Sequence, residues 1–268
     1  MTVWCNGAFV ETITLEASER GLLLGDGLFE TLAVQRGKAI WLDEHLMRLG
    51  QSASELGIPY AKADVQRAVT AILERSGATN EVLRITLTRG PTARGLAAPS
   101  TKPSLIVSLN DFDASKLPAT VRLETSTIRR NATAPSARMK TLNYLDNIMA
   151  ARLVSNSADD ALLLNNTGQV ACATIANLFL LKGEHLITPA LDQGILPGIT
   201  RAKILAGASQ LNLIAHEAAI APLDLTAADA VFLTNSLRLA TPVSTIDGAN
   251  CATRDIRFIN SFLKRSAS

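Results

Sequence analysis

A lysine placed directly before an apolar helical run is the residue of this sequence with the clearest potential for chemistry. Lys140 lies in RMKTLNYLDNIMAA, residues 138–151, where apolar side chains recur at helical spacing and predict a helix that ends near Val154. If the lysine is buried at this junction, desolvation lowers its pKa and leaves a neutral, nucleophilic amine. The alternative is a solvated charge on a loop, which is the usual place for a lysine.

Three further segments carry groups that can bind an anion. In GILPGITRAKIL, residues 194–205, a glycine-rich turn leads into a helix. The free amides of Gly198, Ile199 and Thr200, with the Thr200 hydroxyl, can hold a phosphate there. Ser236 ends a strand in LTNSLRLATPV and offers another hydroxyl and amide, and Arg48 in EHLMRL lies near the apolar side of its helix, where a phosphate or carboxylate partner is one explanation. The alternatives are an ordinary helix start, an ordinary turn and a surface arginine.

The first part of the chain alternates antiparallel strand patterns with two helices. Asn6-Gly7 and Arg36-Gly37 each lie between apolar runs and predict hairpins. Asp43 is expected to cap one helix, and Gly77 is expected to be the C-cap of the next. VLRITLTR and SLIVSLND predict neighbouring strands. We therefore expect a small α+β domain over residues 1–112.

A polar, proline-containing segment separates this domain from a larger one. Residues 113–120, in DFDASKLPAT, are expected to form a linker. Residues 121–268 should form a mixed α/β domain that carries Lys140, so the fold class of the whole chain is α/β. Its expected elements are the strands VRLETSTI, ALLLNN, QVACAT, NLFLLKG, HLITPA, 213–218 and ADAVFLTNS, and the helices 198–211, 223–228 and RDIRFINSFLKR.

Composition excludes several classes of partner. The 268 residues are 47% hydrophobic and 19% charged with a formal net charge of +2, so nucleic acid is not an expected partner. No apolar run is long enough for a membrane span, and the N-terminal residues lack the pattern of a signal peptide. The three cysteines and three histidines have no metal-ligand or disulfide spacing, so we expect no metal site and a cytoplasmic protein.

Taken together, the motifs resemble those of the class IV aminotransferases, the fold type IV group of pyridoxal 5′-phosphate (PLP) enzymes. RGLLLGDGLFETL, EHLMRL, KTLNYLDN, GQV…ANLF…TP and GILPGITR occur in the family's order and at its spacing, from about Asn6 to Asp247. The family includes 4-amino-4-deoxychorismate lyase and the branched-chain and D-amino-acid transaminases. The resemblance implies two domains with PLP between them, an amino-acid-like substrate and a homodimer.

The resemblance also implies roles for individual residues. Lys140 matches the lysine that carries PLP covalently and then moves the proton of the substrate α-carbon. Arg48 matches the phosphate-binding arginine, and Ile199 and Thr200 match the amides and hydroxyl of the phosphate site. Ser236 matches a second phosphate ligand.

Three segments favour the lyase over a transaminase. GDGLFET and LTNSL are similar to the aminodeoxychorismate lyase versions of these motifs, and so is TRGPTARGL, residues 88–96. Arg94 in that last segment can meet a substrate carboxylate with both of its terminal nitrogens, or it is a solvated loop arginine. Thr31 is the other residue expected at the substrate. The favoured reaction releases pyruvate and 4-aminobenzoate for folate synthesis, and a branched-chain or D-amino-acid transaminase is the alternative.

One position departs from the family pattern. In GQVACATIANLF, Cys172 occupies the place of the glutamate that faces the pyridine nitrogen of PLP. A thiol is a poor substitute for a carboxylate that keeps this nitrogen protonated. A weakly active or non-catalytic PLP-binding relative is therefore a further alternative.

Overall fold

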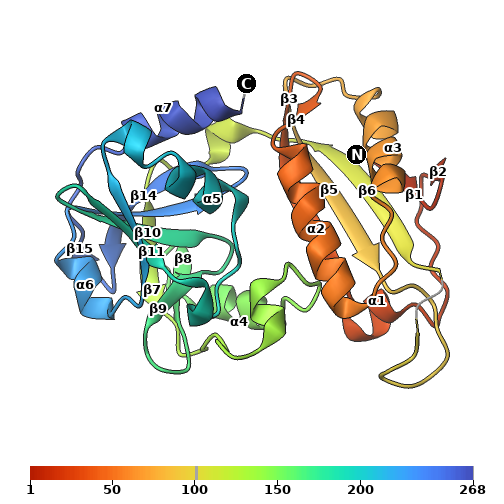
Figure 1. Ribbon diagram of the computed structural model, residues 1–268, viewed down its shortest axis with the longest axis horizontal. Helices are drawn as coiled ribbons and strands as arrows, with labels where there is room; N and C mark the ends of the chain where they lie inside the picture. The colour runs from red at the N-terminus through yellow and green to blue at the C-terminus, as the bar shows by residue number, and fades with distance from the viewer. Residues whose placement is uncertain (100–101, 268) are drawn as a thin grey trace. The chain divides into compact units, whose positions relative to one another are not determined.

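The computed structural model describes residues 1–99 and 102–267. The chain divides into two compact units (Figure 1). The N-terminal unit comprises Met1–Ser115 and Met139–Asn143, and the C-terminal unit comprises Lys116–Arg138 and Tyr144–Ser268. The expectation that the C-terminal domain carries the lysine is corrected, because the short segment around Lys140 groups with the N-terminal unit.

The N-terminal unit is built on an antiparallel sheet with the strand order β2-β1-β6-β5-β3-β4. Helices α2 and α3 pack against one face of this sheet (Figure 1). The elements of the unit are β1 (Thr2–Cys5), β2 (Ala8–Phe9), α1 (Arg20–Leu24), β3 (Gly27–Gln35), β4 (Lys38–Ala39), α2 (Leu42–Leu56), α3 (Lys62–Leu73), β5 (Asn80–Thr88) and β6 (Ser104–Asp111).

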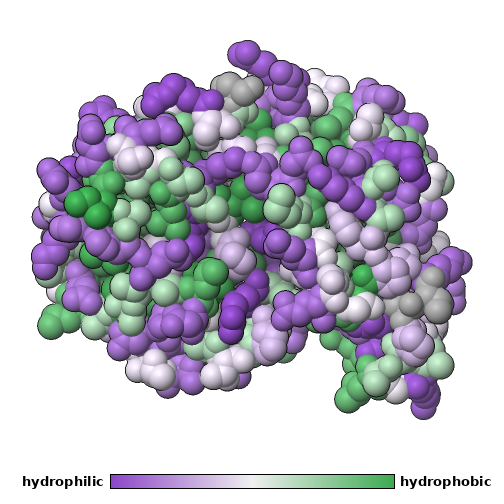
Figure 2. All heavy atoms as spheres, in the orientation of Figure 1, coloured by the Kyte–Doolittle hydropathy of each residue, from purple (hydrophilic) through white to green (hydrophobic). Residues whose placement is uncertain are grey.

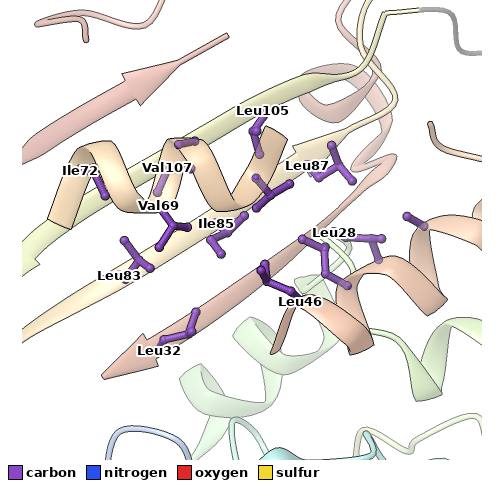
Figure 3. Close-up of a cluster of buried hydrophobic side chains, with 14 of the residues drawn as sticks. Leu28, Leu32, Leu46, Val69, Ile72, Leu83, Ile85, Leu87, Leu105 and Val107 are labelled. Carbon is purple, nitrogen blue, oxygen red and sulfur yellow. The ribbon is translucent and has the colours of Figure 1, made fainter. Parts of the chain in front are cut away.

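The core of this unit lies between the sheet and the two helices (Figure 3). Because side chains alternate along a strand, Leu28 and Leu32 of β3 point toward the helices together with Leu83 and Ile85 of β5. They meet Leu46 of α2 and the apolar stripe of α3, all fully buried. This packing fixes β3 and α2 against each other, and these two elements carry the charged residues described below.

The segment Met139–Asn143 extends this sheet at the edge of β3. The Phe29 amide donates to the Lys140 carbonyl at 2.9 Å, and the Leu142 amide donates to the Gly27 carbonyl at 2.8 Å. A Cβ at Gly27 would lie 2.8 Å from the Leu87 carbonyl oxygen and 2.9 Å from the Leu142 side chain. Only glycine therefore permits this close approach. The pairing fixes the backbone of Lys140 beside β3.

Strands of the C-terminal unit close into a barrel. The sheet order is β12-β11-β10-β13-β14-β7-β8-β9, and β9 also pairs with β10, which closes the ring. Helices α5 and α7 pack outside β13 and β14, and α4 packs on β8. The elements are β7 (Val121–Thr125), α4 (Leu145–Leu153), β8 (Asp160–Leu164), β9 (Val170–Ala173), β10 (Asn177–Lys182), β11 (His185–Pro189), α5 (Ile199–Ala206), β12 (Ile214–Ala218), α6 (Pro222–Thr226), β13 (Ala230–Asn235), β14 (Leu239–Ile246), β15 (Ala249–Asn250) and α7 (Arg257–Ser266).

Several element boundaries differ from the sequence predictions. Helix α2 begins at Leu42 after Trp41 in a left-handed conformation, so Asp43 lies inside the helix and is not its cap. Helix α3 ends at Leu73, before Gly77. The predicted helix 198–211 is α helical only to Ala206 and continues as a separate 3₁₀ turn. Strand β14 and helix α1 were not predicted at all.

No helix among residues 1–99 and 102–267 is long and apolar enough to cross a membrane. On the face drawn in Figure 2, hydrophilic and hydrophobic residues are interspersed.

Candidate functional site

The Lys140 side chain lies against an aromatic ring and near two arginines. Its Nζ is 4.4 Å from the centroid of the Phe29 ring, and the Arg84 guanidinium carbon is 3.9 Å from the same centroid. Burial of the ammonium, reinforced by the positive charges of Arg48 and Arg84, lowers the pKa of Lys140 to about 8, although Glu30 opposes this shift. A substantial share of the amine is therefore neutral near neutral pH, which is the form that attacks a carbonyl.

A buried ion cluster of Glu30, His45 and Arg48 lies between β3 and α2. Arg48 donates from Nε to Oε1 of Glu30 at 2.9 Å and from a terminal nitrogen to Oε2 at 2.5 Å. His45 Nδ1 lies 2.7 Å from Oε2 of the same carboxylate. Burial alone would raise the pKa of Glu30, but the Arg48 charge and the hydrogen bonds from His45 and Arg48 lower it to about 2. Glu30 is thus an anion that holds Arg48 in a fixed orientation.

The charge state of Glu30 also determines the tautomer of His45. Burial, with the positive charges of Arg48 and Lys140, lowers the pKa of His45 despite its carboxylate partner. The ring is therefore neutral at neutral pH, and its Nδ1 must carry the hydrogen because an ionised carboxylate only accepts. Lys140 consequently faces a cluster in which one carboxylate balances one guanidinium and the histidine adds no charge.

Thr31 shares a strand face with the ring that contacts Lys140. Phe29 and Thr31 are two positions apart on β3, and Thr31 pairs with Arg84 of β5. Since alternate residues of a strand point to the same side, Phe29, Thr31 and Arg84 lie on the face opposite to the helices. The structure therefore places Lys140, Arg48 and Thr31 in one unit: the charge of Arg48 acts on Lys140, and Thr31 lies on the strand face of the ring that Lys140 contacts.

The lowered pKa of Lys140 predicts early nucleophilic reactivity as pH rises. Below about pH 8 the ammonium form dominates and does not react, and above it the neutral amine does. In the apoprotein, trinitrobenzenesulfonate labelling of the Lys140 peptide should reach half of its limiting rate near pH 8, against about pH 10.4 for an unperturbed lysine. The exposed Lys182 provides the comparison within the same sample. A midpoint for Lys140 near pH 10 would contradict its proposed environment.

In the C-terminal unit, helix α5 begins without a side-chain hydrogen bond from its N-cap residue. Gly198 is the N-cap residue and has no side chain to accept from the first amides of the helix. A Cβ at Gly198 would collide with the side-chain oxygen of Asn177, whose amide donates to the Leu196 carbonyl at 2.9 Å. The turn before α5 is therefore held by Asn177, with the amides of Ile199 and Thr200 at the positive end of the helix.

Two buried hydroxyls add to this helix end. Thr200 is 1% exposed, Thr234 on the neighbouring β13 is 2% exposed, and neither Oγ1 has a hydrogen-bond partner among the described residues. A buried hydroxyl without a partner costs free energy, so such groups usually mark an unfilled position for a ligand or a water. Ser236 follows β13 by one residue and is half-buried. Amides and hydroxyls of this kind suit a phosphate.

Cys172 lies on β9 within an apolar cluster that includes Ala161, Leu163 and Ile195. Burial raises the pKa of its thiol, the positive charge of Arg130 opposes this in part, and the Asp160 carboxyl adds to it. The thiol is therefore neutral at neutral pH. It cannot supply the negative charge that a glutamate would supply at this position.

The structure places Arg94 on the surface of the N-terminal unit. It lies in the loop after β5 and its side chain is exposed to solvent.

Sequence reasoning missed Glu30, His45, Asn177 and Thr234, which fix or complete the groups it named. The pair of Glu30 and Arg48 gave no signal, because its two residues meet only when β3 packs on α2.

Comparison with known proteins places this arrangement in a family. The model of the family described as amino-transferase class IV matches residues 27–246. The aminodeoxychorismate lyase of Bacillus subtilis (strain 168) is 30% identical over 92% of this chain and 87% of its own length.

Solved structures with the same fold include a lyase and an aminotransferase. The 4-amino-4-deoxychorismate lyase of Pseudomonas aeruginosa is 28% identical, with a TM-score of 0.88 over 98% of each chain. The branched-chain aminotransferase of the thermophilic archaeon Thermoproteus uzoniensis, solved with norvaline, is 26% identical. It has a TM-score of 0.89 over 99% of this chain and 93% of that chain.

Proposed function

Because the chain belongs to the class IV aminotransferase family, we propose that it is a PLP-dependent enzyme that acts on an amino-acid-like substrate. The observation that carries this proposal is Lys140, a lysine with a pKa of about 8 held against the Phe29 ring. Among the family activities we favour elimination of pyruvate from 4-amino-4-deoxychorismate, which leaves 4-aminobenzoate.

Class IV aminotransferases use PLP, and the residues present fit this cofactor. The aldehyde of PLP reacts with a neutral amine, and Lys140 supplies one. The phosphate of PLP needs hydrogen-bond donors, and the α5 amides and the Thr200 hydroxyl, which has no partner among the described residues, supply them. Ile199, Thr200 and Ser236 are thus assigned to the phosphate. PLP, when bound, supplies an electron sink that makes the α-proton of the substrate acidic. The Lys140 amine would take that proton from the α-carbon and, in the favoured elimination, deliver it to the departing pyruvate group.

Arg48 is assigned to the phosphate as well, but its charge is already balanced within the unit. Glu30 binds Arg48 through two hydrogen bonds. The contribution of Arg48 to the binding of an added anion is therefore smaller than that of an unpaired arginine, and its orientation is more strongly fixed. Removing Arg48 would leave the Glu30 carboxylate buried with His45 alone, which also costs stability.

Replacing Thr200 by valine separates cofactor binding from folding. The change removes a hydroxyl that has no partner among the described residues, so the apoprotein should unfold at the same or a higher temperature. The Kd for PLP should rise about ten- to a hundredfold, because a hydrogen bond to a charged group contributes about 1.5–3 kcal/mol. Fluorescence titration with PLP and thermal unfolding measure the two effects.

Thr188→Val is the matched control for this prediction. The Thr188 hydroxyl is fully buried too, but it donates to the Leu178 carbonyl at 2.7 Å. That variant should lose stability and keep the wild-type Kd for PLP. An unchanged Kd in Thr200→Val would remove Thr200 from the phosphate site.

Cys172 supports the lyase over a transaminase. The B. subtilis and P. aeruginosa lyases match nearly the whole chain, and so does the T. uzoniensis aminotransferase, so overall similarity does not discriminate between the two activities. The neutral Cys172 thiol offers the pyridine nitrogen no negative charge, which weakens transamination more than an elimination in which deprotonation and leaving-group loss are coupled. A branched-chain or D-amino-acid transaminase is the second candidate, supported by the T. uzoniensis aminotransferase. A weakly active PLP-binding relative is the third.

Substrate assays distinguish these candidates. PLP-loaded protein is incubated with 4-amino-4-deoxychorismate, and in parallel with branched-chain L-amino acids or D-alanine plus 2-oxoglutarate or pyruvate. Release of pyruvate and 4-aminobenzoate in the first reaction is expected. Amino transfer in the others without that release would replace the lyase by a transaminase.

The assembly and the cellular role are part of the same proposal. We propose a homodimer, a cytoplasmic location and a place in folate biosynthesis, which follow from the favoured reaction and the family resemblance. Multi-angle light scattering of the holoprotein should give twice the chain mass of 28.5 kDa.

A further inference from the structure

An ion cluster separate from Glu30 lies at the start of β3. Oδ2 of Asp26 accepts from Nε of Arg20 at 2.8 Å and from Nε of Arg89 at 2.7 Å. The three side chains are only 8%, 15% and 13% exposed for Arg20, Asp26 and Arg89. Burial would raise the pKa of Asp26, but the hydrogen bonds and charges of Arg89 and Arg20 lower it, so the carboxylate is ionised. Such a pair of charge-assisted bonds fixes both guanidinium planes.

The remaining nitrogens of Arg20 bind the loop that carries Arg94. Its terminal nitrogens donate to the Gly95 carbonyl at 2.7 Å and to the Leu96 carbonyl at 3.0 Å. The loop has little apolar anchorage of its own, because Leu96 is 85% exposed. Arg20 therefore joins a fixed carboxylate to the two residues that directly follow Arg94.

The same cluster is joined to the segment of Lys140. Asp26 directly precedes Gly27, whose carbonyl accepts from Leu142, and the Asp26 carbonyl accepts from the Arg89 amide at 3.0 Å. Arg89 also donates to the Leu56 carbonyl at the end of α2 at 2.7 Å. One group of charges thus fixes the start of β3, the end of α2 and the loop after β5.

We propose that Arg20 is a positioning residue that holds the loop 91–96 so that Arg94 is presented to the carboxylate of the substrate. This rests on the proposed function and on the role that the sequence indicates for Arg94, which is to meet a substrate carboxylate. Arg20 itself touches neither substrate nor cofactor. Lysine cannot replace it, because a single ammonium cannot reach Asp26 and two carbonyls with the geometry of a planar fork.

The test compares Arg20→Lys and Arg20→Gln with the wild-type holoprotein. Hydrogen exchange of residues 91–99 should become about tenfold faster in both variants, while exchange in β3 stays slow. KM for the carboxylate-bearing substrate should rise about tenfold with kcat changed less than about threefold, since the contact is made in ground and transition states alike. Arg67→Gln, which removes an exposed ion pair on α3, is the control and should change neither. If Arg20→Gln does not fold, the test rests on Arg20→Lys, because this variant keeps a positive charge beside Asp26.

Two results would overturn the positioning role. One is wild-type exchange of residues 91–99 in the folded Arg20 variants. The other is a wild-type KM in those variants while Arg94→Ala has a raised KM. A wild-type KM in Arg94→Ala would show that Arg94 does not bind the substrate carboxylate, and it would overturn the proposal that Arg20 presents Arg94 to the substrate. Hydrogen exchange of residues 91–99 would then still test whether Arg20 holds the loop.

Discussion

Replacing Lys140 by alanine is expected to lower turnover at least about a thousandfold, because one side chain supplies both the covalent attachment and the proton transfer. The variant should also lose the absorbance band of covalently attached PLP. It should still fold, because the lowered pKa of Lys140 means that the ammonium is less stable in the folded protein than in water. Removing the side chain therefore removes no favourable charge interaction.

Lys140→Arg and Lys182→Ala provide the controls. Arginine keeps a cation over the Phe29 ring but offers no nucleophilic amine, so it should be as inactive as alanine. Lys182 is an exposed lysine of the C-terminal unit, and its loss should change nothing. Turnover within about tenfold of wild type in a folded Lys140→Ala sample would rule out the assignment.

Replacing Cys172 by glutamate is expected to accelerate the transamination half-reaction by about tenfold or more. A carboxylate a hydrogen bond away would raise the pKa of the pyridine nitrogen, and each unit of that shift is worth about 1.4 kcal/mol. The buried thiol has a raised pKa and is neutral, so the wild-type protein lacks this charge. The positive charge of Arg130 near Cys172 would favour ionisation of the new glutamate, and burial and the Asp160 carboxyl would oppose it.

Cys172→Gln is the matched control, because glutamine has nearly the size of glutamate without its charge. Both variants should lose stability, since a longer polar side chain enters a site where Cys172 is 7% exposed. Only Cys172→Glu should convert bound PLP to pyridoxamine phosphate faster with a good amino donor, measured by stopped-flow absorbance. Equal rates in the two variants, both with normal PLP affinity, would show that charge at this position does not limit the reaction.

The sequence predicts that Lys140 is a candidate for chemistry, but it does not predict the environment of this lysine. From the sequence alone Lys140 is either a nucleophile or a solvated charge, and only contacts with residues distant in sequence distinguish these two alternatives. The backbone of Lys140 pairs with Phe29, and its pKa depends on Arg48 and Arg84. No local pattern reports these neighbours, because they meet through strand pairing and helix packing.

Two elements escaped sequence reasoning for different physical reasons. Helix α1 is short, and its leucines, Leu22 to Leu24, are more than half exposed, so it has no buried periodic face to detect. Strand β14 contains Pro242, which argues against an interior strand, yet β14 pairs with both β13 and β7. In both cases tertiary contacts outweigh the local signal.

The most direct test of the central claim is to locate the attached cofactor. The PLP-loaded protein is reduced with borohydride, digested and mapped by mass spectrometry. A pyridoxyl phosphate adduct confined to the peptide that contains Lys140 is the expected result. An adduct on another lysine, with Lys140 unmodified, would contradict the assignment of Lys140 as the residue that carries PLP.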